Sequence, residues 1–63
     1  MPFVQIYLLE GRSDDKKRQL IERITQTVVE VLEAPTENVR VWIHDMPKGN
    51  WGIGGKTAKD LGR

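Results

Sequence analysis

The chain has 63 residues, enough for one domain but not for two. Lys and Arg number 10 against 9 for Asp and Glu, so the net charge of +1 lacks the basic excess of proteins that bind nucleic acid through its phosphates. No apolar stretch is long enough to span a bilayer, and the N-terminus has neither the basic start nor the apolar run of a signal peptide. We therefore expect a cytoplasmic protein without nucleic-acid or membrane partners.

A domain this short has a marginal core. At about 60 residues a domain buries only about 60% of the surface that its unfolded chain exposes, and disulfides, a metal or oligomerisation often supply the missing stability. The chain has no cysteine and a single histidine, His44, so neither disulfides nor a structural zinc site is expected. Self-association is the remaining source of stability.

The apolar pattern predicts a strand, a helix and a second strand. Residues 3–9 and 39–45 read as strands, and both faces of the first are largely apolar, which suits a sheet covered on both sides. Between them, Ser13 is a good N-cap for a helix over residues 14–32, whose basic cluster at residues 16–18 we interpret as solvated charge. The apolar stripe of this helix consists of Leu20, Ile21, Ile24, Val28, Val31 and Leu32.

Strand, helix and strand in this order predict one βαβ unit with a parallel strand pair and a right-handed crossover. A two-stranded sheet with one helix leaves a sheet face and both edges open, and it is not expected to be stable alone. Residues 46–55 are rich in turn formers and predict a short hairpin. The expected fold class is α/β (α+β): a single βαβ unit with a C-terminal hairpin, in two layers of sheet and helix, within an oligomer.

Pro2 has the most distinctive potential chemistry. Removal of Met1 would expose a secondary amine, and an apolar pocket or nearby guanidinium groups lower the pKa of such an amine from the usual ~7.7–8.0. An amine that titrates near ambient pH is a good general base, and its conjugate acid is a good general acid. The alternative is that Pro2 merely begins a strand, a position where proline is tolerated.

Two arginines are placed to accompany Pro2. The N-terminal ends of parallel strands lie at the same sheet edge, so Arg40 at the start of the second strand is expected near Pro2, on a face shared with Trp42. Arg12 follows the opposite end of the first strand, and it would reach Pro2 only from another subunit. The alternative for each arginine is simple exposure to solvent.

Four segments in this order resemble the 4-oxalocrotonate tautomerase family. They are Met-Pro before a short strand, LEGRSD at residues 9–14, VRV at residues 39–41 and KGNWGIGG at residues 48–55. The resemblance extends from Pro2 to about Ala58. It implies that residues 1–63 form a single tautomerase domain, a βαβ subunit of a homohexamer built as a trimer of dimers, with active sites across subunit boundaries.

The resemblance also implies an activity. Members of the family are isomerases that ketonise 2-hydroxydienoates such as 2-hydroxymuconate, in aromatic degradation, with no cofactor and no metal. By analogy Pro2 takes the hydroxyl proton of this small enol carboxylate and returns it to carbon, and Arg40 binds the carboxylate and 2-hydroxyl end. Arg12 grips the distal carboxylate, and the Leu9 backbone lines the pocket. Trp51 replaces the usual phenylalanine as an apolar wall, the alternative being a plug at a subunit interface.

Other activities stay open at this point. A hydratase or dehalogenase of the same scaffold needs a carboxylate where this chain has Ile53. A decarboxylase and an inactive assembly subunit are further alternatives, although an assembly subunit needs neither Arg12 nor Arg40. His44 is expected to be an ordinary strand side chain. A homohexamer and a mixed hexamer with a related chain are both compatible with the sequence.

Overall fold

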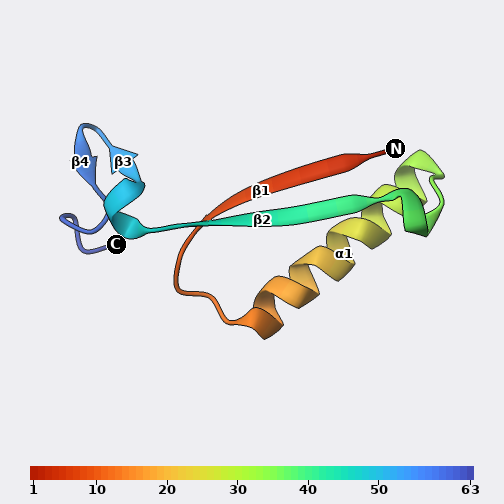
Figure 1. The fold of residues 1–63 in the computed structure, drawn as a ribbon, viewed down its shortest axis with the longest axis horizontal. Coiled ribbons are helices and arrows are strands. Elements are labelled where there is room, and N and C mark those ends of the chain that lie inside the picture. The colour runs from red at the N-terminus through yellow and green to blue at the C-terminus, as the bar shows by residue number, and fades with distance from the viewer.

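The structure, a computed structural model, describes residues 1–63 and shows a βαβ unit from which a small C-terminal lobe projects (Figure 1). In chain order the elements are β1 (Phe3–Leu9), α1 (Asp14–Leu32), the 3-10 turn η1 (Thr36–Asn38), β2 (Arg40–Met46), the 3-10 turn η2 (Lys48–Asn50), β3 (Gly52–Ile53) and β4 (Lys56–Thr57). The predicted order of strand, helix, strand and hairpin is confirmed.

The two long strands pair in parallel, as predicted. Their register runs from Phe3 opposite Arg40 to Leu9 opposite Met46. The second strand begins one residue later than the sequence pattern indicates. Val39 has an extended backbone, but its N–H donates to the Thr36 carbonyl at 3.1 Å and so closes η1 instead of joining the sheet.

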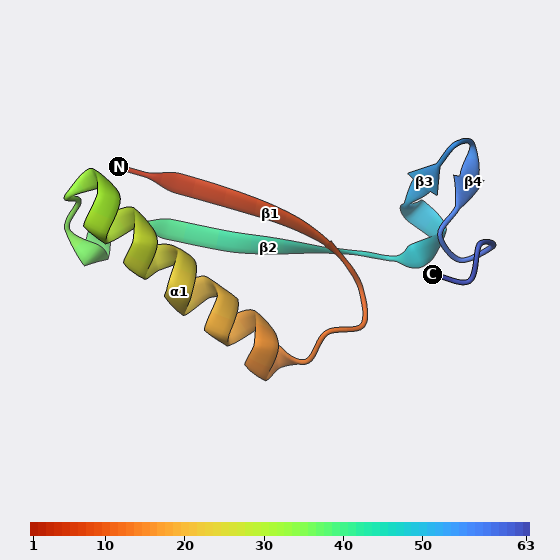
Figure 2. The same ribbon diagram turned by 180° about the vertical axis from the view of Figure 1, so that it is seen from behind.

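Helix α1 has the predicted bounds and covers one face of the strand pair (Figures 1 and 2). The Ser13 hydroxyl accepts the Lys16 N–H at 3.2 Å, and Glu33 ends the helix in the left-handed conformation, with φ of 54°. Val31 and Leu32, expected on the covered stripe, are 73% and 62% exposed. These two side chains are exposed because the last turn of α1 lies past the start of the strands, where no sheet covers it (Figure 1).

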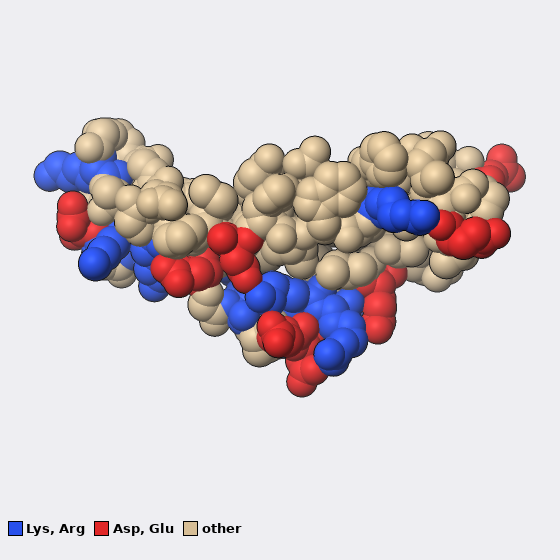
Figure 3. All heavy atoms as spheres, in the orientation of Figure 1, with Lys and Arg blue, Asp and Glu red and all other residues tan.

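The opposite face of the sheet is open. Phe3, Tyr7 and Trp42 lie on it and are 64%, 57% and 39% exposed, with the Phe3 and Trp42 rings 5.9 Å apart. This face forms a largely uncharged band in Figure 3, whereas Lys, Arg, Asp and Glu gather over the helix and the lobe. An exposed apolar surface of this kind marks an interaction site.

A single chain has almost no core. Val39 and Ala58 are the only buried residues. The radius of gyration is 14.7 Å, whereas a compact domain of this length has about 10.6 Å. The subunit is therefore shaped to be covered by other chains.

The C-terminal lobe contains the predicted hairpin. Strands β3 and β4 are antiparallel, and Gly54 and Gly55 between them have φ of 59° and 88°. Positive φ at both central residues defines the tight turn that fits the twist of a two-residue hairpin, and glycine adopts it without strain. No helix in the structure has the length and apolar character required to cross a membrane.

Candidate active site

Pro2 and Arg40 lie at the start of the two strands, which we call the proline end. Pro2 is half-buried just before β1, and its carbonyl accepts the Arg40 N–H at 3.0 Å. The parallel register thus brings the two backbones together as predicted, and it puts the Arg40 side chain on the open face with Trp42. Met1, ahead of Pro2, is 70% exposed.

The Arg40 guanidinium is directed toward η1. Its Nη1 donates to the carbonyl oxygens of Glu37 and Val39. A guanidinium has five N–H donors, so Nη2 and Nε remain available to an anionic ligand at the exposed edge of the sheet. The site is therefore cationic beside Pro2, but the guanidinium is already anchored.

Leu9 and Arg12 lie at the other end of the strands, which we call the Arg12 end. The Arg12 Nη1 donates to the Leu9 carbonyl at 3.1 Å, and Arg12 is otherwise exposed. Strand β1 has seven residues, and at about 3.3 Å per residue it puts about 23 Å between Pro2 and Leu9. Arg12 therefore cannot reach the Pro2 of its own chain, as the sequence analysis anticipated.

Trp51 lies in the lobe beyond the Arg12 end, between η2 and β3 (Figure 1). It is half-buried, and its carbonyl accepts the Ala58 N–H at 2.8 Å. The Arg12 end of the strand pair thus carries Leu9, Arg12 and Trp51. The proline end carries Pro2 and Arg40. No pocket forms within a single chain.

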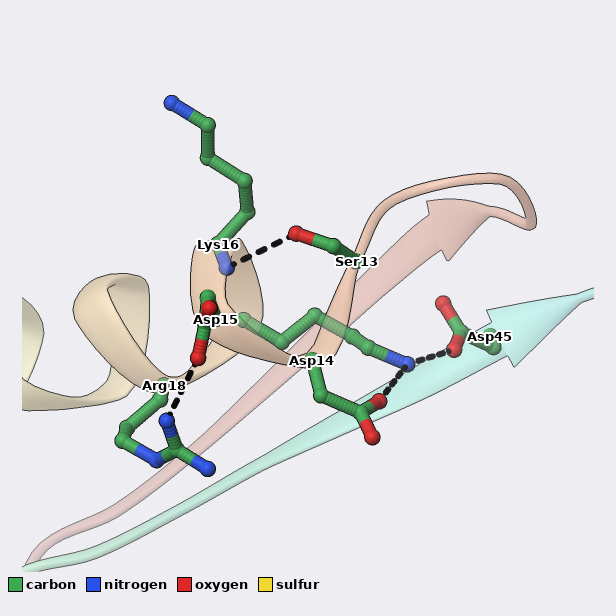
Figure 4. A network of polar contacts seen from close by, with 7 residues as sticks. Ser13, Asp14, Asp15, Lys16, Arg18 and Asp45 are labelled. Carbon is green, nitrogen blue, oxygen red and sulfur yellow. Dashed lines mark hydrogen bonds and ion pairs between the residues drawn. The ribbon is translucent and has the colours of Figure 1, made fainter.

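The expectation that the whole basic cluster at residues 16–18 is solvated charge is wrong for Lys17. Its Nζ lies 2.5 Å from Asp45 Oδ2 and 3.5 Å from Asp14 Oδ1. Figure 4 draws both contacts as dashed lines that end on the labelled Asp45 and Asp14. The hydrogen bond to Asp45 raises the pKa of Lys17 above its ordinary value. Lys17 precedes Leu20 and Ile21 by three and four residues, so it lies on the apolar stripe and faces the sheet. The pair ties the start of α1 to the end of β2.

Glu10 makes a contact that the sequence pattern does not predict. Its Oε2 accepts the Lys48 N–H at 2.9 Å, which connects the bend after β1 to η2. The only signal in the sequence is its position two residues before Arg12. His44 is an ordinary strand residue, as expected: its ring stacks on Tyr7 with centroids 4.5 Å apart, and its Nε2 lies 3.2 Å from Gln5 Oε1.

Comparison with known proteins decides the family. Residues 2–61 match the family described as "Tautomerase enzyme". The chain belongs to this family. It is 62% identical to a 2-hydroxymuconate tautomerase of Comamonas testosteroni over 63 residues, which are 100% of both chains. The predicted family and the predicted enzyme class, a tautomerase and hence an isomerase, are confirmed.

Solved structures agree with the fold. A 4-oxalocrotonate tautomerase isozyme from Methylibium petroleiphilum is 64% identical and superposes with a TM-score of 0.92, over 98% of this chain and 100% of that chain. A heterohexamer 4-oxalocrotonate tautomerase from Chloroflexus aurantiacus is 30% identical and superposes with a TM-score of 0.89, over 97% of this chain and 98% of that chain. The predicted βαβ fold of this family is thereby confirmed.

Proposed function

We propose that this tautomerase ketonises 2-hydroxymuconate or a close 2-hydroxydienoate, with Pro2 as general base and acid once Met1 is removed. The similarity to a 2-hydroxymuconate tautomerase over the whole chain supports the substrate class. The observation that carries the mechanism is the division of the candidate residues between the two ends of one strand pair. Catalysis in the cytoplasm, without cofactor or metal, is part of the proposal.

Two copies would complete the site by pairing their β1 edges. A two-fold axis through Ile6, the middle residue of β1, makes the strands antiparallel and sets Pro2 of one copy opposite the partner's Glu10. The partner's Leu9, Arg12 and Trp51 then adjoin Pro2. Pairing through β2 instead would leave Pro2 on the outer strands, at least two strand spacings or about 10 Å from the partner.

Stacking of three such dimers would cover the open sheet face. Phe3, Tyr7 and Trp42 give that face the apolar character that a subunit interface needs. We therefore propose a homohexamer, a trimer of dimers. The heterohexamer relative makes a mixed hexamer with a related chain the alternative assembly.

In this site the Pro2 amine removes the proton from the 2-hydroxyl group and, as its conjugate acid, delivers it to a carbon of the dienol. The double bonds shift, and the product is the conjugated ketone with no net gain or loss of atoms. Arg40 donates to the oxygen on which negative charge develops. Arg12 holds the distal carboxylate through a bidentate contact, and Trp51 excludes water beside the amine.

The hairpin does not favour hydration or dehalogenation. Ile53 ends β3, and the turn that follows it is Gly54–Gly55, so this segment offers no carboxylate to activate water. The retention of both arginines, each with its guanidinium anchored on a backbone carbonyl, favours an active enzyme over an assembly subunit.

One variant tests the role of Pro2. A residue added before Pro2 turns the amine into an amide, and kcat/KM for 2-hydroxymuconate should fall at least ~10³-fold, the order expected when a general base is lost. Sedimentation should show an unchanged oligomer, and the intact mass of the parent should show Pro2 as the terminus. Pro2→Ala is the matched control, since it keeps an amine and should retain partial activity. Full activity in the extended variant would refute the proposal.

A further inference from the structure

The C-terminal lobe, residues 47–63, is joined to the βαβ unit by very few polar contacts. Its backbone hydrogen bonds are internal, such as Ala58 N–H to the Trp51 carbonyl at 2.8 Å and Lys59 N–H to the Lys48 carbonyl at 3.2 Å. Figure 1 shows the lobe projecting beyond the strands, away from α1. The position of Trp51 therefore depends on whatever holds the start of this lobe.

The Glu10 side chain makes the one hydrogen bond between the βαβ unit and the lobe, 2.9 Å from its Oε2 to the Lys48 nitrogen. Lys48 is the first residue of η2, so its N–H has no partner within the turn. The Glu10 N–H donates to the Met46 carbonyl, also at 2.9 Å. Glu10 thus holds the chain on both sides of Pro47, and its carboxylate bond is charge-assisted.

Glu10 also belongs to the bend that carries Arg12. Gly11 between them has φ of 123°, a left-handed value that turns the chain toward α1. The Arg12 guanidinium is bonded to Leu9 on the other side of Glu10. One carboxylate therefore connects the Arg12 bend to the segment that leads, three residues after Lys48, into Trp51.

We infer that Glu10 is a positioning residue, whose carboxylate holds the Arg12 bend and the Trp51 lobe in one fixed arrangement for binding the distal part of the substrate. The inference rests on the proposed function, in which Arg12 and Trp51 of the same chain contact one substrate. Glu10 itself transfers no proton. Loss of its bond leaves the lobe attached mainly through the extended chain at Pro47, so Trp51 moves relative to Arg12.

Four substitutions isolate the bond. Glu10→Ala removes the acceptor, while Glu10→Gln keeps an oxygen at the same position. Lys48→Pro removes the donor from the other side, and Lys48→Ala is its control because it keeps the N–H. Proline fits at residue 48 because Pro47 has φ of −57° and ψ of 142°, the extended conformation required before a proline. Proline is also tolerated in the first position of a helical turn.

Steady-state kinetics should separate positioning from catalysis. Glu10→Ala and Lys48→Pro should each raise KM for 2-hydroxymuconate about tenfold with kcat changed by less than about threefold, the result of a misplaced binding group. Glu10→Gln and Lys48→Ala should stay within about threefold of the parent. The double variant Glu10→Ala/Lys48→Pro should be no worse than either single one, since both remove the same bond.

Fluorescence anisotropy decay of Trp51, in a Trp42→Phe background, measures the local motion of the indole ring independently of catalysis. The Trp51 ring should show faster local motion in Glu10→Ala and Lys48→Pro than in their controls, in oligomers of unchanged sedimentation. This signal should change even if Pro2 proves not to be the base, so the two proposals fail separately. If Glu10→Ala does not assemble, the comparison of Lys48→Pro with Lys48→Ala tests the inference.

Unchanged Trp51 motion in Lys48→Pro would overturn the inference. A fall in kcat of about a hundredfold or more in both Glu10→Ala and Glu10→Gln would also overturn it, because Glu10 would then act as a proton donor or acceptor.

Discussion

The two ends of the strand pair are built differently. At the proline end, one backbone hydrogen bond joins Pro2 to Arg40, and the neighbouring turn of α1 leaves Leu32 exposed. At the Arg12 end, the Arg12–Leu9 bond, the Glu10–Lys48 bond and an ion pair tie together the bend, the lobe, α1 and β2. In the proposed function the first end presents the reactive amine, and the second end, which has more contacts between elements, binds the distal part of the substrate.

This difference suggests how a chain of 63 residues can carry an active site without a pocket of its own. In the proposed dimer each copy would supply one end to each of two sites, because antiparallel pairing of β1 would bring unlike ends together. Substitutions at the proline end should therefore affect the chemical step, and substitutions at the Arg12 end should affect binding.

The largest effect among the arginines is expected at the proline end. Arg40→Ala should lower kcat roughly a hundredfold with both a dicarboxylate and a monocarboxylate enol, because it removes the donor to the developing negative charge. Steady-state assays measure kcat with the two substrates. Arg40→Lys is the control that keeps a positive charge. An unchanged kcat would remove Arg40 from the chemical step.

A smaller and more selective effect is expected at the Arg12 end. Arg12→Ala should raise KM about tenfold for a dicarboxylate, since a hydrogen-bonded ion pair is lost, with kcat nearly unchanged. A monocarboxylic enol has no distal carboxylate, so its KM should change much less. Equal losses with both substrates would contradict the division between the two ends.

The smallest effect is expected for the Lys17–Asp45 ion pair, which joins α1 to β2 at the Arg12 end. Because the pKa of Lys17 is raised in the folded chain, its contribution to stability is present below the ordinary value of 10.5 and is lost as the pH rises through the folded-state pKa. The urea midpoint of the parent should exceed that of Lys17→Met at pH 8 to about 10, and the difference should vanish at higher pH. Lys16→Met, on the exposed side of α1, is the matched control. A difference independent of pH would show that packing, not charge, is involved.

Periodicity alone predicts much of this fold. A short apolar run predicted β1, and spacings of three and four, together with the Ser13 cap, predicted α1 and its bounds. The start of β2 was wrong by one residue because an extended Val39 resembles a strand residue, although its N–H is used by η1. Lys17 was misread because it was grouped with its basic neighbours, while its own spacing to Leu20 already placed it on the covered stripe.

The Glu10–Lys48 bond could not be predicted, since it joins residues 38 apart and depends on the chain path at Gly11 and Pro47. The division of the site was predictable in part. Parallel pairing places Arg40 beside Pro2 and Arg12 at the far end, whatever the side chains do. What the pattern could not give is the direction of the Arg40 guanidinium, which is set by the carbonyls of η1.

In the proposed enzyme Pro2 and Arg12 of different copies share one site, and mixing two defective chains tests this sharing. One chain has a residue added before Pro2, and the other carries Arg12→Glu, which repels the distal carboxylate. Each alone should be nearly inactive toward 2-hydroxymuconate. Dissociation and joint reassembly in equal amounts makes half of the dimers mixed, with one intact site each, so activity should return to about a quarter of the parent's. No recovery above the sum of the two separate chains, in a sample whose native mass spectrum shows mixed oligomers, would contradict the claim.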